Sequence, residues 1–134
     1  GCGVQYFSQQ AVARLAPAAG FNFGDMPFPE QLLEVQKAME KGHEGARKIY
    51  QSIGIYLGYT IAHYANFYQI ENLLILGRVT SGHGGELILD KASEVLRDEF
   101  PHLTEQITMT TPDEQMKRHG QAVAAASLPA CPTV

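Results

Sequence analysis

The sequence of 134 residues has no tryptophan, only two cysteines, and fewer basic than acidic residues, ten against fourteen. Cys2 and Cys131 belong to no C-x-x-C pair or other metal-ligand spacing, so we expect two free thiols in a reducing cytoplasm. The basic residues are scattered, which argues against direct contact with nucleic acid. No apolar run reaches the roughly 18 residues that a membrane span needs, so we expect a soluble protein without membrane contact.

Apolar residues make up 45% of the chain and charged residues 18%, a composition typical of one globular domain. The sequence starts with Gly1 and not with methionine, so we expect a processed product or a fragment of a longer protein. Its last residues, 129–134, include prolines and are expected to form a flexible tail.

The periodicity of apolar residues predicts a helix-rich α/β fold, with a long central helix followed by a β-α-β-α unit. An apolar loop over residues 17–29 is expected to cover a core or a partner. The predicted helices span residues 4–16, 30–41, 43–69, 86–99 and 112–127, and the predicted strands span residues 73–76 and 106–110.

The central helix carries small residues on one face. Gly54, Gly58 and Ala62 recur every four residues, although glycine inside a helix costs about 1 kcal/mol relative to alanine. We therefore expect another backbone to approach this face closely. It belongs either to a neighbouring element of the same chain or to a second copy at a dimer seam.

The run Leu73-Leu74-Ile75-Leu76 is apolar without alternation, which predicts a parallel strand buried on both faces. Two strands make a poor sheet on their own. We therefore expect the sheet to be completed by another chain or by the rest of a longer protein.

A glycine-rich stretch, residues 77–85, joins a predicted strand to a predicted helix, where α/β proteins bind ligands. A helix N-terminus offers unpaired N–H groups to a phosphate, and glycines let the backbone approach it. The stretch nevertheless lacks known fingerprints: His83-Gly84 replaces the Lys-Ser/Thr of the Walker motif, and Leu87 replaces the third glycine of a dinucleotide site. A tight strand-to-helix connection is therefore the alternative to a phosphate site.

The residues show no complete catalytic set and no metal-ligand set. His83 is expected at the surface, and His63, in the long helix, is expected in the core. Four acids in the helix after the glycine-rich stretch follow helical spacing, which is typical of a solvated face: Glu86, Asp90, Glu94 and Asp98.

The order of these features resembles the C-terminal lobe of ROK-family proteins, a family of repressors, open reading frames and sugar kinases. The resemblance rests on Gly54–Gly58 and Ile70–Gly77, where a long helix feeds a strand that ends in a glycine turn, and on Ser81–Glu86. The ending Gly120–Ala126 is similar, and the start Gly1–Ser8 is similar to the tail of the family's cysteine-rich zinc motif. The likeness runs along nearly the whole chain.

The resemblance implies an actin-like ATPase fold of the ribonuclease H-like type, in which two lobes close on ATP, Mg²⁺ and a sugar. Residues 1–128 would form part of the second lobe, with the first lobe and the catalytic aspartate upstream. The chain would supply the nucleotide-binding side of sugar phosphorylation and be inactive alone. Six residues would lie beside the nucleotide: Gly77, Arg78, Thr80, Ser81, Gly84 and Gly85.

Two positions depart from the family pattern. Arg78 stands where the family usually has a second glycine, and its guanidinium could contact a phosphate or fill the space that the adenine needs. Val4 stands where the family usually has a glutamate that touches a sugar hydroxyl. Only Cys2 of three zinc cysteines is present, so we expect no zinc in this chain. A sugar-responsive transcriptional regulator or a non-catalytic dimerisation lobe is therefore the alternative to a kinase, and we expect a homo-oligomer.

Overall fold

The structure is a computed structural model that describes residues 2–112. The predicted helix 112–127 and the predicted tail 129–134 lie outside the described residues, apart from Pro112. In chain order the described elements are α1 (Val4–Phe7), α2 (Gln9–Leu15), the 3₁₀ helix η1 (Pro17–Ala19), α3 (Phe28–Glu40), α4 (Glu44–Ala65), β1 (Asn72–Leu74), the 3₁₀ helix η2 (Arg78–Thr80), α5 (Gly82–Glu99), α6 (Pro101–Thr104) and β2 (Thr108–Thr110).

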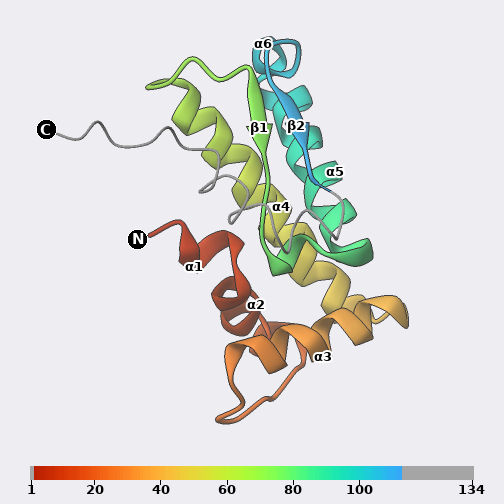
Figure 1. The fold of residues 1–134 in the computed structure, drawn as a ribbon. Coiled ribbons are helices and arrows are strands. Elements are labelled where there is room, and N and C mark those ends of the chain that lie inside the picture. The colour runs from red at the N-terminus through yellow and green to blue at the C-terminus, as the bar shows by residue number, and fades with distance from the viewer. Residues whose placement is uncertain (1, 113–134) are drawn as a thin grey trace, which may run out of the picture.

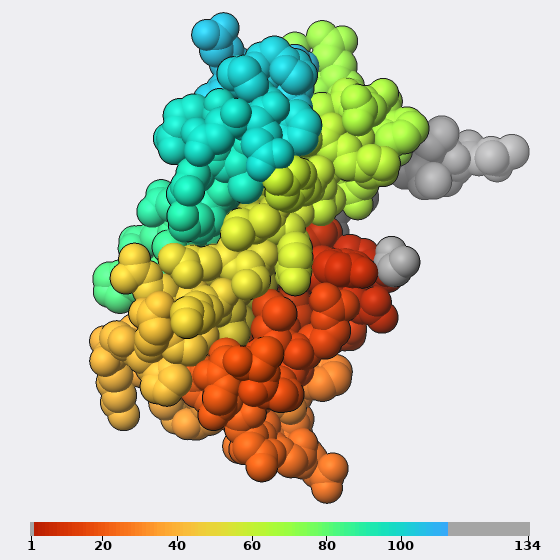
Figure 2. Space-filling model, turned by 180° about the vertical axis from the view of Figure 1, so that it is seen from behind, coloured from red at the N-terminus to blue at the C-terminus, as the bar shows by residue number. Residues whose placement is uncertain are grey.

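Strands β1 and β2 pair in parallel and form a small sheet in front of two long helices (Figure 1). Asn72 lies opposite Thr108, and Leu74 lies opposite Thr110. Helices α4 and α5 lie side by side behind the sheet, and Figure 2 shows their outer sides on the back of the molecule. This arrangement confirms a helix-rich α/β chain in which a helix connects two parallel strands.

Helices α4 and α5 approach each other at a distance that only small residues on α4 allow. A Cβ added to Gly54 would lie 2.6 Å from the carbonyl oxygen of Ile88, and a Cβ added to Gly58 would lie 2.7 Å from the Cβ of Val95. The predicted close approach of a backbone at these glycines is therefore confirmed. The alternative of a dimer seam on this face is wrong, because α5 of the same chain covers it.

The core lies between the inner faces of helices α2 to α5. Its largest fully buried side chains are Tyr50, Leu32, Ile49, Ile53, Ile61, Ile88, Leu96, Val12 and Val35. Phe21 and Phe23 of the predicted apolar loop pack against this core, with their rings stacked 5.4 Å apart. Leu33 of α3 is 53% exposed, because that helix turns Leu32 and Val35 inward.

The predicted helix 4–16 is interrupted at Ser8, whose backbone is extended (φ −124°, ψ −173°). The Ser8 side chain accepts a hydrogen bond from the backbone N–H of Gln10 at 3.1 Å and so caps α2. Serine favours this position because its hydroxyl oxygen satisfies an N–H group that has no acceptor inside the helix. The apolar spacing runs through the break and therefore does not reveal it.

One face of the sheet lies against the helices, and the other face is open. Leu73 and Met109 pack against the core, whereas Leu74 is 58% exposed and Leu76 is 43% exposed. The prediction of a strand buried on both faces is therefore wrong for the described part of the chain. The strand is parallel as expected, but its second face needs a cover that residues 2–112 do not supply.

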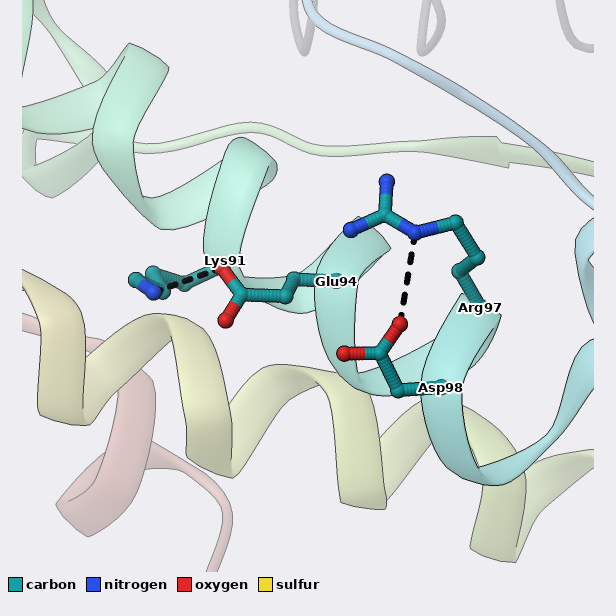
Figure 3. A network of polar contacts seen from close by, with 4 residues as sticks. All are labelled: Lys91, Glu94, Arg97 and Asp98. Atoms are coloured by element: carbon teal, nitrogen blue, oxygen red, sulfur yellow. Dashed lines mark hydrogen bonds and ion pairs between the residues drawn. The ribbon is translucent and has the colours of Figure 1, made fainter.

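Helix α5 begins at Gly82, earlier than the predicted start at residue 86, and turns a charged face to solvent. Figure 3 shows two ion pairs on this helix: Lys91 Nζ lies 2.5 Å from Glu94 Oε2, and Arg97 Nε lies 3.3 Å from Asp98 Oδ1. The predicted solvated acidic face is confirmed by this exposure. Exposed pairs of this kind contribute at most about 1 kcal/mol each, so apolar packing against α4 holds α5 in place.

Candidate functional site

The glycine-rich stretch carries the chain from the end of β1 into the N-terminus of α5. Gly77 has φ +130° and ψ 158°, a conformation that is essentially restricted to glycine. The Gly77 carbonyl oxygen accepts hydrogen bonds from the Thr80 N–H at 3.2 Å and from Thr80 Oγ1 at 2.7 Å. Ser81 occupies the N-cap position of α5, although its side chain does not cap the helix. The turn is thus fixed at the carboxyl end of a parallel strand, where α/β proteins bind ligands.

The glycines of this turn serve two different purposes. At Gly77 an added Cβ would meet nothing within 4 Å, so the space beside this residue is open. At Gly84 a Cβ would lie 2.5 Å from the Tyr50 ring, and at Gly85 it would overlap the Thr80 carbonyl group. Gly84 and Gly85 are both buried, and we infer that their lack of a side chain serves packing.

Two grooves flank the turn. The α3 groove, of about 140 Å³, is lined by Gln36, Met39 and Glu40 of α3 and by residues 81–84. The Arg78 groove, of about 340 Å³, lies between the turn and the junction of α1 and α2, and its lining includes Val4, Ser8, Gln9, Gln10, Gly77 and Arg78. Ligand pockets usually enclose about 300–1,000 Å³, so the α3 groove alone is too small for a nucleotide.

The two grooves differ in charge. Glu40 lines the α3 groove, whereas Arg78 is the sole charged residue among the described residues that line the Arg78 groove. Gln36 Nε2 donates a hydrogen bond to the Arg78 carbonyl oxygen at 3.0 Å and so ties α3 to the turn. This arrangement offers acceptors for hydroxyl and amino groups on one side of the turn and a cation for an anionic group on the other.

The structure brings the predicted site residues together in part. Four of the six line a groove: Gly77, Arg78, Ser81 and Gly84. Thr80 and Gly85 line neither groove; Thr80 is buried and its hydroxyl closes the turn, while Gly85 provides room for the Thr80 carbonyl group. The predicted set is therefore a mixture of groove-lining residues and residues that shape the turn.

Sequence reasoning missed the residues of α3 that line the site. Gln36 lies in the helix predicted over residues 30–41, and nothing in the pattern of that helix links it to Arg78. Glu40 has the spacing of an ordinary solvent-facing residue. The contact between Gln36 and the turn joins residues 42 positions apart, and only the packing of α3 against the rest of the chain creates it.

Among the described residues that line the two grooves there is one histidine, His83. His83 is exposed as predicted, with its Nδ1 3.2 Å from Glu86 Oε2. The prediction that His63 lies in the core is wrong. It is exposed on the outer face of α4, where its ring lies 5.2 Å from the Phe67 ring. The buried face of this helix carries the preceding residues Ile61 and Ala62.

Comparisons of the chain with known protein families, with curated proteins and with solved structures found no match. Within residues 2–112 no three His, Cys, Asp or Glu side chains come together in a way that could hold a metal ion, and Cys2 is an exposed free thiol. None of the helices in the same range combines the length and apolarity that crossing a bilayer requires. Statements about function therefore depend on the turn and its two grooves.

Proposed function

We propose that the chain is the C-terminal part of the nucleotide-binding lobe of a ROK-type sugar kinase with the actin-like ATPase fold. The observation that carries this proposal is the fixed glycine turn at the carboxyl end of β1, with a groove on each side. The segments that carry the ROK resemblance, Ile70–Gly77 and Ser81–Glu86, are the segments that build this turn. A parallel strand that ends in a glycine turn and feeds a helix is also the arrangement that binds phosphorylated ligands in many α/β proteins.

A nucleotide bound at this turn would have one preferred orientation. Its ribose and base would extend along the α3 groove and past it, because this groove is too small to enclose them; Gln36 and Glu40 would offer an amide and a carboxylate to hydroxyl and amino groups. Its phosphates suit the Arg78 groove, because a guanidinium forms strong charge-assisted hydrogen bonds with phosphate oxygens. The remaining wall of the site would come from the upstream lobe, and the open face at Leu74 fits a sheet that the rest of a longer protein would cover.

The part of this chain in the reaction is to bind and orient ATP. ATP supplies the phosphoryl group when bound, with Mg²⁺ neutralising its developing charge. The resemblance places the aspartate that accepts the proton of the sugar hydroxyl upstream of this sequence. We therefore expect no sugar-dependent ADP release from the chain alone in a coupled assay, and measurable release would overturn this division of labour.

A titration with ATP tests the nucleotide site directly. Added to ¹⁵N-labelled chain, ATP is expected to shift the backbone amide signals of residues 36–40 and 77–83 in a saturable manner. Glu40→Ala is expected to weaken ATP binding, and Glu34→Ala, an exposed acid on the same helix outside both grooves, serves as the matched control. ATP that leaves these amides unshifted at millimolar concentration contradicts the proposal.

Gly84→Val is a poor test of the same site, even though it alters the glycine-rich turn. A Cβ at this position would lie 2.5 Å from the buried Tyr50 ring, so the variant is expected to lose stability whether or not it binds a ligand. Groove-lining residues with exposed side chains, such as Glu40 and Arg78, separate binding from folding.

A sugar-responsive regulator on the same scaffold is the second candidate. The observation that favours it is that Val4 and Arg78, the two departures from the kinase pattern, line one groove. A regulator keeps ligand binding without phosphoryl transfer. In the full-length protein, sugar binding without ATP turnover, together with a DNA-binding segment upstream, would favour this candidate over the kinase.

A further inference from the structure

The Arg78 groove differs in charge from the chain as a whole. The formal net charge of the chain is −4, yet no acidic side chain lines this groove of about 340 Å³. Val4 contributes an apolar wall, and Arg78 contributes a permanent positive charge. The described lining of the groove therefore carries positive charge, although the net charge of the chain is negative.

A hydrogen bond fixes the main chain of Arg78, while its side chain is exposed and can contact a ligand. Gln36 Nε2 donates to the Arg78 carbonyl oxygen at 3.0 Å, and the residue is exposed. No ion pair joins its guanidinium to a carboxylate of residues 2–112. An exposed guanidinium without an internal counter-ion can pair with an anionic ligand at little desolvation cost.

Arg47 lies beside a groove with the opposite environment. Arg47 lines a separate groove of about 300 Å³ together with Glu44, Glu86 and Asp90. Those carboxylates would repel an added anion. The comparison shows that an arginine beside a groove is not enough by itself, and that the Arg78 groove differs from the Arg47 groove in having no acid among its described lining residues.

The wall of the Arg78 groove is also rich in hydrogen-bond donors. Within residues 2–112 the backbone N–H groups of Gly77, Arg78 and Val79 have no acceptor. Gln9 and Gln10, whose side chains carry amide donors, also line the groove. Several donors beside one cation match the oxygens of a phosphate group, which can accept many hydrogen bonds.

We propose that the Arg78 groove binds the phosphate group of a phosphorylated small molecule, with the Arg78 guanidinium paired to the phosphate oxygens. Two sources supply this chemistry: a hexose phosphate, or the phosphates of a nucleotide that lies across the glycine turn. For the nucleotide source the assignment rests on the proposed function. For the hexose phosphate it stands without a nucleotide site.

A titration of ¹⁵N-labelled chain with four separate probes tests the assignment: inorganic phosphate, glucose 6-phosphate, glucose and ATP. Inorganic phosphate and glucose 6-phosphate are expected to shift the amides of Ser8, Gln9, Gly77 and Arg78, whereas uncharged glucose is not. Tighter binding of glucose 6-phosphate than of ATP identifies the sugar source. Tighter binding of ATP, with shifts that extend to residues 36–40, identifies the nucleotide source.

Three variants separate the groove from general charge effects. Arg78→Gln is expected to weaken binding of the phosphorylated probes by about tenfold or more, as the loss of a charge-assisted hydrogen bond predicts. Val4→Glu, at a position that is 44% exposed, places a carboxylate in the groove and is expected to weaken binding as well. Arg47→Gln removes the same charge from the acidic groove and is expected to leave the affinity unchanged.

Three results overturn the assignment: equal binding in Arg78→Gln and the parent chain, equal losses in Arg78→Gln and Arg47→Gln, or binding of glucose as tight as that of its phosphate. The proposed function fails separately. ATP that shifts residues 36–40 regardless of Arg78, while glucose 6-phosphate binds Arg78→Gln and the parent chain equally, supports the nucleotide site and refutes the phosphate assignment. Glucose 6-phosphate that binds through Arg78, while ATP leaves the amides of the turn unshifted, supports the phosphate assignment and refutes the nucleotide site.

Discussion

At the scale of single residues, Tyr50 combines full burial with an unsatisfied hydroxyl group. The residue is 0% exposed, its ring lies against Gly84, and its Oη has no hydrogen-bond partner among the residues that the structure describes. Burial without a partner raises the pKa of Tyr50 above its ordinary value, because the phenolate would lose its hydration. The packing of the ring therefore stabilises the core, while the buried hydroxyl group destabilises the folded state.

Removal of this hydroxyl group is expected to stabilise the protein. Tyr50→Phe keeps the ring and eliminates a buried donor without an acceptor, whose cost is about 1–3 kcal/mol. We expect the free energy of unfolding to rise by about 1 kcal/mol in urea denaturation at pH 7. Tyr68→Phe, at a position that is 67% exposed, is the control and should change little. A less stable Tyr50→Phe would indicate that the hydroxyl group has a partner.

The same residue predicts a dependence of stability on alkaline pH. Because the pKa of Tyr50 is raised in the folded state, the folded protein keeps its proton where an unfolded tyrosine, with a pKa of about 10, releases it. Its contribution to the free energy of unfolding is therefore constant below about pH 10 and falls as the pH rises further. We expect urea denaturation between pH 9 and pH 11 to show a steeper loss for the parent chain than for Tyr50→Phe. Parallel pH profiles would contradict this assignment.

At the scale of elements, the contact between α4 and α5 depends on the small residues of α4. The Ile88 backbone and the Lys91 side chain of α5 occupy the volume that a side chain at Gly54 would fill. The cost of glycine in a helix is thus offset by a close contact between two long helices. The stability of this pair should be more sensitive to added volume on α4 than to lost charge on α5.

Substitution at Gly54 tests this packing. In an open helix Gly→Ala stabilises by about 1 kcal/mol, but here the Cβ would lie 2.6 Å from the Ile88 carbonyl oxygen. Overpacking costs about 1–3 kcal/mol, so we expect Gly54→Ala to lower the midpoint of thermal unfolding. Ser52→Ala, on the same helix and outside the contact, should keep or raise it. A rise in both variants would show that α5 has room to move away.

At the scale of the whole molecule, the sheet is covered on one face only. Leu74 and Leu76 are exposed at 58% and 43%, and parallel sheets are usually buried on both faces. The open face therefore marks the side on which the rest of a longer protein, or a second copy of the chain, would pack. We therefore assign the self-association expected from the sequence, as a prediction, to this face and not to the glycines of α4.

Analytical ultracentrifugation tests this expectation. We expect the average mass of the chain to rise with concentration, and Leu74→Glu to reduce that rise because it places a charge on the open apolar face. Leu33→Glu, at a position on α3 that is 53% exposed, is the matched control and should associate like the parent chain. A monomer at all concentrations, or equal effects of the two variants, would contradict a role for the open face.

Features governed by local chemistry could be predicted from the sequence, and features governed by distant contacts could not. The helical periods of α3, α4 and α5 and the parallel pairing of the two strands follow from residue spacing, and each is present. The break at Ser8 was not predicted, because its cap depends on one side chain inside an unbroken apolar pattern. The site shows the same division: Gly77 and Arg78 adjoin the predicted glycine turn, whereas Gln36 reaches it only through the packing of α3.

Sequence alone determined that strand β1 would end in a glycine turn and that the long helix needed a close neighbour. Both follow from the backbone freedom and the missing side chain of glycine, which are properties of the residue. Tertiary structure decided which glycines are open and which are packed, that α5 is the neighbour of α4, and that Val4 and Arg78 share a groove. These outcomes depend on how separate helices pack against one another. The free energy of that packing is distributed over many contacts that no local sequence pattern encodes.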